Sequence, residues 1–285
     1  MYKLINFYTQ RFSFPHKGWK YFHRLLKWWG IHTKEYRKKL SNGIFMLLTP
    51  SEHIQQQLFW YGYYEKPVAL LLQNLINPNS IILDIGANIG YFTLIAAQRA
   101  KIGRVYAFEP VKELFQKLQR NIVENNFQNT ELINSAVGES QKDSIIYISS
   151  TDNAGMSSLK PPENFSGITQ AIKIINIDQW IVQSGIKQVD IIKLDVEGGE
   201  LFALHGMTEI LMNFKPVLIV EINPDTLAYF NLLPMDVMHY LNNLDYLPFT
   251  ITKNGFLQKT PEIASQENIA FVHREKLKKF NSYFV

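Results

Sequence analysis

The sequence contains no cysteine among its 285 residues. Disulfide bonds, thiolate metal sites and cysteine nucleophiles are therefore excluded, a composition that suits a reducing cytoplasm. No run of about 18 apolar residues occurs, so no transmembrane helix is expected, and the N-terminus lacks the apolar stretch of a secretory signal. Apolar residues make up 46% of the chain, enough for a globular core. We therefore expect a cytoplasmic protein.

The glycine fingerprint of nicotinamide-dependent enzymes, G-x-G-x-x-G, is also absent. In its place an apolar strand at 81–85 leads into Asp84-x-Gly86-x-Asn88-x-Gly90 and a helix. The next apolar strand ends in Glu109, where a carboxylate can accept hydrogen bonds from both ribose hydroxyls of an adenosine. A carboxylate in the turn repels a pyrophosphate but suits a cationic ligand, so the motif favours S-adenosylmethionine.

Basic residues are concentrated in residues 1–42, which carry ten Lys or Arg and a single acid, Glu35, a formal charge of +9. Trp19, Phe22 and Trp29 recur there at helical spacing and predict an amphipathic basic helix. Such a helix either docks on the body of the protein or lies in a membrane interface beside anionic lipid, and both alternatives stay open. No motif supports nucleic-acid binding, and none is expected.

From residue 80 onward, strands and helices are expected to alternate. We predict strands at 81–85, 104–108, 131–135, 144–149, 172–175, 189–194, 217–221, 246–252 and 268–273, and helices at 88–100, 111–126, 178–184, 199–212 and 234–242. Continuous apolar strands between helices predict an α/β, Rossmann-like, mostly parallel sheet covered on both faces. We expect three parts: a basic, aromatic-rich helical extension (1–42), a strand and helix that cap the active site (43–79), and the Rossmann-like domain (80–285).

A second polar cluster, Lys193-Leu-Asp195-Val-Glu197-Gly-Gly-Glu200, follows the strand at 189–194. Ligands bind at the carboxyl ends of strands in open α/β sheets, so Asp195 and Glu197 are expected to face a cleft. Glu200 falls in the first turn of the next helix, where a carboxylate also stabilises the helix dipole, so structural and functional roles are equally supported. The local sequence offers too few oxygen ligands for a metal, and no metal site is expected.

These segments together are similar to the signature blocks of the FkbM family of S-adenosylmethionine-dependent methyltransferases. The similarity extends over about residues 43–275 and also includes Tyr61–Glu65, Ala107–Pro110, Asn153–Leu159 and Val217–Glu221. The resemblance implies a class I methyltransferase fold with seven strands, the last antiparallel, and S-adenosylmethionine as cofactor. It also implies O-methylation of a hydroxyl on a sugar, glycolipid, polysaccharide or secondary metabolite.

Three groups of residues are expected in the active site. Asp195 or Glu197 would act as the general base, with Lys193 tuning their charge or contacting the acceptor. The cofactor is expected to contact Asp84, Gly86, Asn88, Gly90, Tyr91, Glu109, Ser135 and Ala136. The acceptor is expected to contact Glu65, Asn153, Ser157 and Ser158.

Two other functions stay open from the sequence. A non-catalytic membrane-docking protein could keep the methyltransferase fold without the activity, because a fold alone does not determine function. The intact acids Asp84, Glu109 and Asp195 argue against that alternative. A nicotinamide-dependent oxidoreductase is disfavoured by the missing glycine fingerprint. The sequence indicates neither the acceptor nor an oligomeric state.

Overall fold

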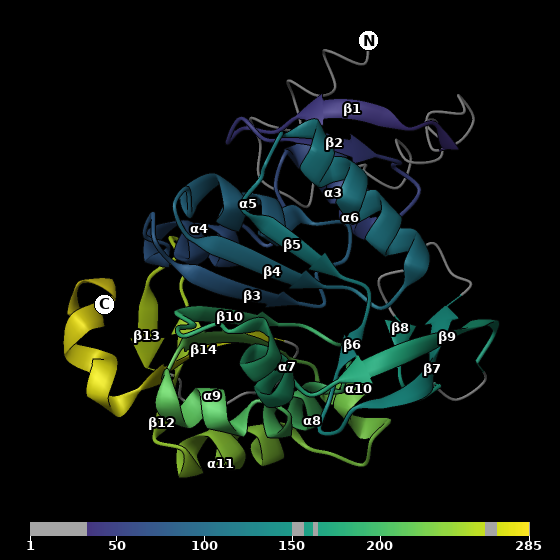
Figure 1. Cartoon of the computed structure of the whole chain (residues 1–285). Coiled ribbons are helices and arrows are strands. Elements are labelled where there is room, and N and C mark those ends of the chain that lie inside the picture. The colour runs from purple at the N-terminus through teal and green to yellow at the C-terminus, as the bar shows by residue number, and fades with distance from the viewer. Residues whose placement is uncertain (1–32, 150–156, 162–164, 260–266, 285) are drawn as a thin grey trace.

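The computed structural model describes residues 33–149, 157–161, 165–259 and 267–284 (Figure 1). The strands of its main sheet are β3 (Ile81–Ile85), β4 (Arg104–Phe108), β5 (Thr130–Ile133), β10 (Ile191–Leu194), β11 (Val217–Ile222), β12 (Tyr246–Ile251), β13 (Leu257–Lys259) and β14 (Glu267–His273). They are arranged in the order β13-β12-β14-β11-β10-β3-β4-β5. The five strands from β11 to β5 are parallel, and β14 is antiparallel to both of its neighbours.

This sheet confirms the expected α/β class, with the last strand antiparallel. It has eight strands where seven were expected, because the chain after β12 turns back and pairs once more along the edge. The turn closes at Gly255, whose φ of 74° is readily adopted only by glycine. The added strand β13 is three residues long, too short to predict from an apolar pattern.

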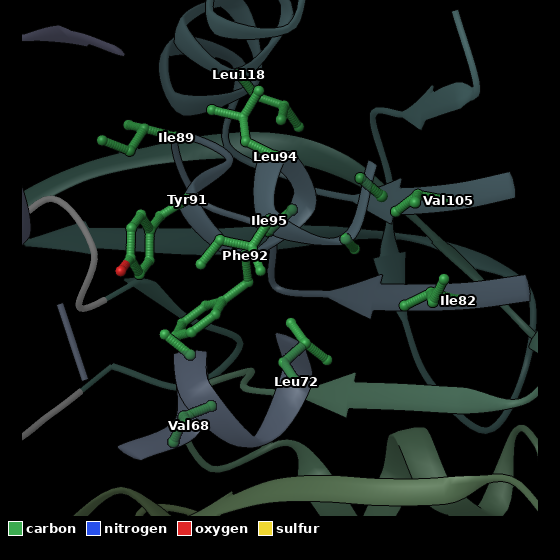
Figure 2. Close-up of a cluster of buried hydrophobic side chains, with 14 of the residues drawn as sticks. Val68, Leu72, Ile82, Ile89, Tyr91, Phe92, Leu94, Ile95, Val105 and Leu118 are labelled. Atoms are coloured by element: carbon green, nitrogen blue, oxygen red, sulfur yellow. The ribbon is translucent and has the colours of Figure 1, made fainter. Parts of the chain in front are cut away.

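Helices cover both faces of the main sheet (Figure 1). One face is packed by α3 (His53–Tyr61), α4 (Lys66–Leu75), α5 (Tyr91–Arg99) and α6 (Lys112–Glu124), and the other by α7 (Ile177–Ser184), α8 (Glu200–His205), α9 (Thr208–Asn213), α10 (Pro224–Ala228) and α11 (Pro234–Asn243). Consecutive strand residues point to opposite faces, so Ile82 belongs to the first core and Leu83 to the second. Figure 2 shows part of the first core, to which Leu72 of α4, Ile82 of β3 and Phe92 of α5 all contribute side chains.

A β-hairpin precedes these helices and lies beside α6 (Figure 1). It consists of β1 (Tyr36–Lys39) and β2 (Phe45–Leu48), paired antiparallel. Residues 36–39 were expected to be part of a helical extension, and that prediction is wrong because they form the strand β1. Within β1 the side chain of Lys38 is buried, and its Nζ lies 5.2 Å from the centre of the Phe59 ring. Residues 1–32, with the predicted amphipathic helix, lie outside the described residues, so membrane contact stays a prediction.

A second, smaller sheet was not expected. It joins β6 (Ala136–Val137), β7 (Lys142–Ser149), β8 (Ser157–Ser158) and β9 (Gly167–Ile175) in the order β6-β9-β7-β8. The sequence predicted strands at 144–149 and 172–175 but did not separate them from the main sheet. In Figure 1 this sheet lies beyond the arrowheads of β3, β4 and β5, where ligands bind in such folds.

The helix expected over 199–212 is divided into α8 and α9 at Gly206. A Cβ on Gly206 would lie 2.1 Å from the Gly138 carbonyl oxygen, so these two segments of the backbone are too close for any residue larger than glycine. Asp178 then accepts hydrogen bonds from the Glu209 and Ile210 amides, both at 3.0 Å, and caps the new helix start. The chain ends in a 3₁₀ segment, η2 (Arg274–Tyr283), and none of the described helices is long and apolar enough to cross a membrane.

The Phe271 side chain on β14 is fully buried in the second core, and its removal tests that core. We expect Phe271→Ala to lower the free energy of unfolding by about 3–5 kcal/mol, because a large cavity opens between packed strands and helices. The control Val182→Ala shortens an apolar side chain that is 80% exposed. It should change the free energy of unfolding by less than about 0.5 kcal/mol. Equilibrium urea unfolding measures both, and equal effects would contradict the assigned core.

Candidate active site

A cavity of about 270 Å³ lies at the carboxyl ends of β3, β4, β10 and β11. Ten residues predicted from the sequence form part of its wall: Gly86, Asn88, Tyr91, Glu109, Ser135, Ala136, Ser157, Lys193, Asp195 and Glu197. Four others, Asp84, Gly90, Glu65 and Ser158, stand next to wall residues but do not line the cavity themselves. Asn153 lies outside the described residues. Sequence reasoning did not include His53, Tyr64, Phe92 and Glu221, which also line the cavity.

The loops that follow β3 and β10 touch each other at Gly86. A Cβ on Gly86 would lie only 1.7 Å from the backbone oxygen of Asp195, and its φ of +84° also favours glycine. The Asp195 amide donates to the Ile85 carbonyl at 3.0 Å, which carries the parallel pairing past the end of β10. The glycine turn and the acidic motif, distant in sequence, therefore form one wall.

Glu109 is buried at the carboxyl end of β4 and binds the backbone of the glycine loop. One carboxylate oxygen accepts from the Asn88 amide and the other from the Val111 amide, both at 2.8 Å. Each oxygen keeps a second lone pair, so the carboxylate can still accept from a ligand in the cavity. Burial raises the pKa of Glu109 to about 7, against the two amide hydrogen bonds, which favour the ionised form.

Asp84 and Lys193 lie side by side on β3 and β10, on the face packed by α4 and α5. Asp84 accepts from the Thr93 hydroxyl at 2.5 Å, and no described residue donates to its other oxygen, Oδ1. Lys193 Nζ donates to Asp195 Oδ2 at 2.8 Å and lies 4.6 Å from the centre of the Phe92 ring. Burial opposes the lysine charge, but the carboxylates Asp195, Glu65 and Asp84 outweigh it and raise the pKa of Lys193.

The acidic loop after β10 is fixed by side chains that point into its own backbone. Glu200 Oε1 accepts from the amides of Val196 and Gly198, at 3.2 and 3.1 Å, so Glu200 shapes the loop. Ser158, expected to contact the acceptor, instead donates to the Glu197 carbonyl at 3.0 Å. Glu197 itself has a φ of 54°, a conformation that is uncommon for a residue with a side chain. Strain of this kind persists where surrounding contacts enforce it.

Carboxylates outnumber cations in the cavity. Asp195, Glu197 and Glu221 each bring one oxygen within 4.8 Å of the other two. Burial, followed by repulsion from Asp195 and Glu200, raises the pKa of Glu197 to about 8. Burial likewise raises the pKa of Glu200 to about 7. The absence of a metal site stays a prediction, because three convergent carboxylates are a cluster that the local motif did not reveal.

Glu221 is the acid that sequence reasoning missed. It lies near the carboxyl end of β11, the neighbour of β10, and is buried. The signal that identified Glu109 and Asp195, an acid at the end of an apolar strand, is present there too.

The residues present fit S-adenosylmethionine, the expected cofactor. The Glu109 carboxylate retains acceptor positions for ribose hydroxyls, and the close backbone at Gly86 leaves the loop without a projecting side chain. The buried carboxylates around the cavity suit a sulfonium and an ammonium group. Asp84 was expected to contact the cofactor, but it is buried behind the wall and does not line the cavity.

Gly86 should be the least tolerant position of the loop. We expect Gly86→Ala to weaken binding of S-adenosylhomocysteine by about tenfold or more, because the added methyl displaces the loop from the Asp195 carbonyl. Gly185→Ala is the matched control: its φ is also positive, at +68°, but nothing lies within 4 Å of the added carbon. Isothermal titration calorimetry measures both, and similar affinities for the two variants would contradict the steric argument.

The buried acids predict how stability changes with pH. Glu109, Glu197 and Glu200 ionise near pH 7 to 8 in the folded protein but near 4.5 when unfolded. Between these values the folded state keeps protons that the unfolded state has lost, so the free energy of unfolding should fall as pH rises from 5 to 8. Urea unfolding at several pH values measures the slope. Glu200→Gln should make it shallower, and a rise in stability over this interval would contradict the prediction.

Comparison with known proteins identifies the family. A sequence model described as the methyltransferase FkbM domain matches residues 84–248, more than half of the chain. The chain is 30% identical over 159 residues to the hexuronic acid methyltransferase AglP of Haloferax volcanii. The aligned region covers 56% of this chain and 62% of AglP. It is 22% identical over 211 residues to the AMB antimetabolite synthetase AmbE of Pseudomonas aeruginosa, covering 62% of this chain and 10% of AmbE.

Among solved structures, an FkbM methyltransferase from Methylobacillus flagellatus is 22% identical, with a TM-score of 0.44 over 70% of this chain and 44% of that one. The chain thus spans less than two thirds of the length of each of these three relatives. The domain match contains the glycine loop, Glu109 and the acidic motif that form the cavity wall. This chain therefore belongs to the FkbM family of methyltransferases, whose cofactor is S-adenosylmethionine.

Proposed function

We propose that this protein transfers a methyl group to a hydroxyl oxygen of a sugar, glycolipid, polysaccharide or secondary metabolite, with Glu197 as the general base. The observation that carries the proposal is the half-buried Glu197 carboxylate, in the wall of the same cavity as the glycine loop and Glu109. S-adenosylmethionine, when bound, supplies an electrophilic methyl group on a sulfonium. The protein must then hold the acceptor oxygen and remove its proton.

Glu197 suits the role of base better than Asp195. The pKa of Glu197, raised to about 8, lies near the operating pH, where proton transfer by a general base is most efficient. Asp195 is already engaged by Lys193 Nζ at 2.8 Å. In this proposal Lys193 holds Asp195 in place, and the Asp195 charge beside Glu197 helps to raise the pKa of the base.

Fixed surroundings support the same role. Ser158 and Glu200 restrain the backbone on both sides of the Glu197 side chain, so the carboxylate needs little reorganisation before it accepts a proton. Tyr64, Phe92 and Val196 in the cavity wall would exclude water from the reacting groups. The relative AglP is described as a hexuronic acid methyltransferase, which favours a sugar among the acceptor classes.

Substitution of the two acids tests the proposal. We expect Glu197→Gln to lower kcat by about 10²- to 10⁴-fold, because the amide cannot accept the proton, while the Kd for S-adenosylhomocysteine changes little. In the wild type, kcat/KM should rise with pH through about 8 as Glu197 ionises, and this rise should be absent in the variant. Methyl transfer from labelled S-adenosylmethionine to a panel of neutral sugars, uronic acids and glycolipids measures the rates.

The comparison variant is Asp195→Asn, which leaves Glu197 intact but removes the negative charge paired with Lys193. It should alter the pH at which the rate rises, because the charge next to Glu197 is lost. If Glu197→Gln keeps wild-type turnover, Glu197 is not the base. If the wild type binds S-adenosylhomocysteine but methylates no hydroxyl in the panel, while an amine or a thiol accepts the methyl group, O-methylation is wrong.

A further inference from the structure

One polar side chain outside the cavity wall connects the N-terminal hairpin to the cofactor loop. Asn121 lies on α6 and is fully buried. Its Oδ1 accepts from the Leu47 amide on β2 at 2.8 Å, and its Nδ2 donates to the Ile89 carbonyl of the glycine loop at 2.9 Å. A buried amide with partners on both ends is held in a single orientation.

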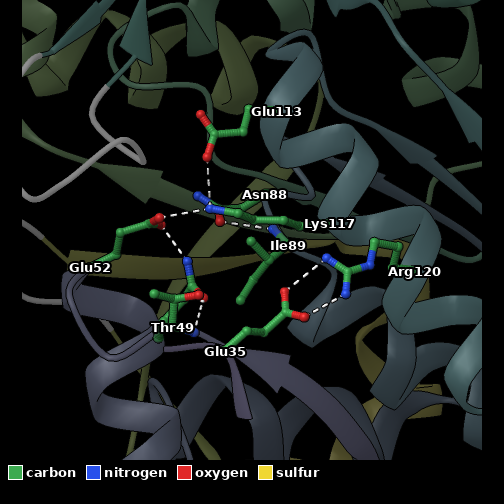
Figure 3. A network of polar contacts seen from close by, with 9 residues as sticks. Glu35, Thr49, Glu52, Asn88, Ile89, Glu113, Lys117 and Arg120 are labelled. Atoms are coloured by element: carbon green, nitrogen blue, oxygen red, sulfur yellow. Dashed lines mark hydrogen bonds and ion pairs between the residues drawn. The ribbon is translucent and has the colours of Figure 1, made fainter. Parts of the chain in front are cut away.

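The hairpin side of this contact is a pairing between a strand and a helix. On β2, the Phe45 amide donates a hydrogen bond to the side chain of Asn125, and the Leu47 amide donates to the side chain of Asn121, each at 2.8 Å. Residues two apart on a strand are about 6.8 Å apart, close to the spacing of residues four apart on one helix face. Figure 3 shows two ion pairs from α6 to residues that flank the hairpin: Arg120 faces Glu35, just before β1, and Lys117 faces Glu52, just before α3.

On its other side, Asn121 contacts a part of the loop whose backbone has two positive φ angles close together. Ile89 stands between Asn88, with a φ of 52°, and Gly90, with a φ of 94°. Glu109 holds the Asn88 amide on one side, and Asn121 holds the Ile89 carbonyl on the other. A Cβ on Gly90 would lie 2.5 Å from Leu118 Cδ1, so α6 also presses directly against the loop.

We infer that Asn121 is a positioning residue for the cofactor loop, and that the β1–β2 hairpin supports cofactor binding through it. The hairpin lies before the segment that matches the FkbM domain, which begins at residue 84. The Asn121 amide keeps the Ile89 carbonyl turned toward α6, and this fixes the strained peptides on either side of it. The inference depends on the cofactor alone and is independent of the proposed acceptor.

Two neighbouring asparagines allow a matched test. Asn121→Ala removes the contacts with both β2 and the loop, whereas Asn125→Ala removes contacts with β2 and α6 only. We expect Asn121→Ala to raise the Kd for S-adenosylhomocysteine by about tenfold or more, since the loop loses a buried hydrogen bond. Asn125→Ala should leave the Kd within about twofold, although both variants lower the midpoint of thermal unfolding.

A third variant separates the two contacts of Asn121 and guards against a misfolded alanine variant. Asn121→Asp keeps an oxygen for the Leu47 amide but replaces the donor to Ile89 with a second oxygen. Burial raises the pKa of the new carboxyl, so titration at a pH high enough to ionise it should give weakened cofactor binding with the hairpin contact retained. Wild-type affinity in Asn121→Asp, or equal losses of affinity in Asn121→Ala and Asn125→Ala, would overturn the inference, because Asn121 would then be only a structural anchor.

Discussion

The active site depends on the contact between the backbone at Gly86 and the carbonyl of Asp195. This contact exists because β3 and β10 are adjacent parallel strands whose chains leave the sheet at the same level. It brings a loop suited to a cofactor and a loop rich in acids together without any intervening side chain. The glycine loop and the acidic loop are thereby held against each other by main-chain contact.

The sequence was sufficient where a local rule determines the outcome. An acid at the end of an apolar strand faces the ligand edge of a parallel sheet, and Glu109 and Asp195 both follow this rule. The β-strands of the core were also predictable, because consecutive residues such as Ile82 and Leu83 point to opposite faces of the sheet and are both apolar. These features need no knowledge of which distant segments meet.

Other features depend on contacts that no local pattern records. Asp84 accepts from Thr93 and does not line the cavity, and Ser158 donates to the Glu197 backbone. The second sheet forms because β9 pairs with both β6 and β7, which lie far from it in sequence. At the break, Gly206 lies against the Gly138 carbonyl, which belongs to another segment. In each case tertiary contacts that a local pattern does not record produced an arrangement other than the predicted one.

The asparagines of α6 have one more consequence for the molecule. A strand at the end of a sheet presents unpaired amides and carbonyls, which can recruit a strand of another molecule and begin aggregation. On β2, Asn125 accepts from the Phe45 amide and donates to its carbonyl, at 2.8 and 2.7 Å, and Asn121 occupies the Leu47 amide. Helix side chains therefore occupy these three backbone groups on the β2 edge of the hairpin, and the groups are not free to pair with a strand of another molecule.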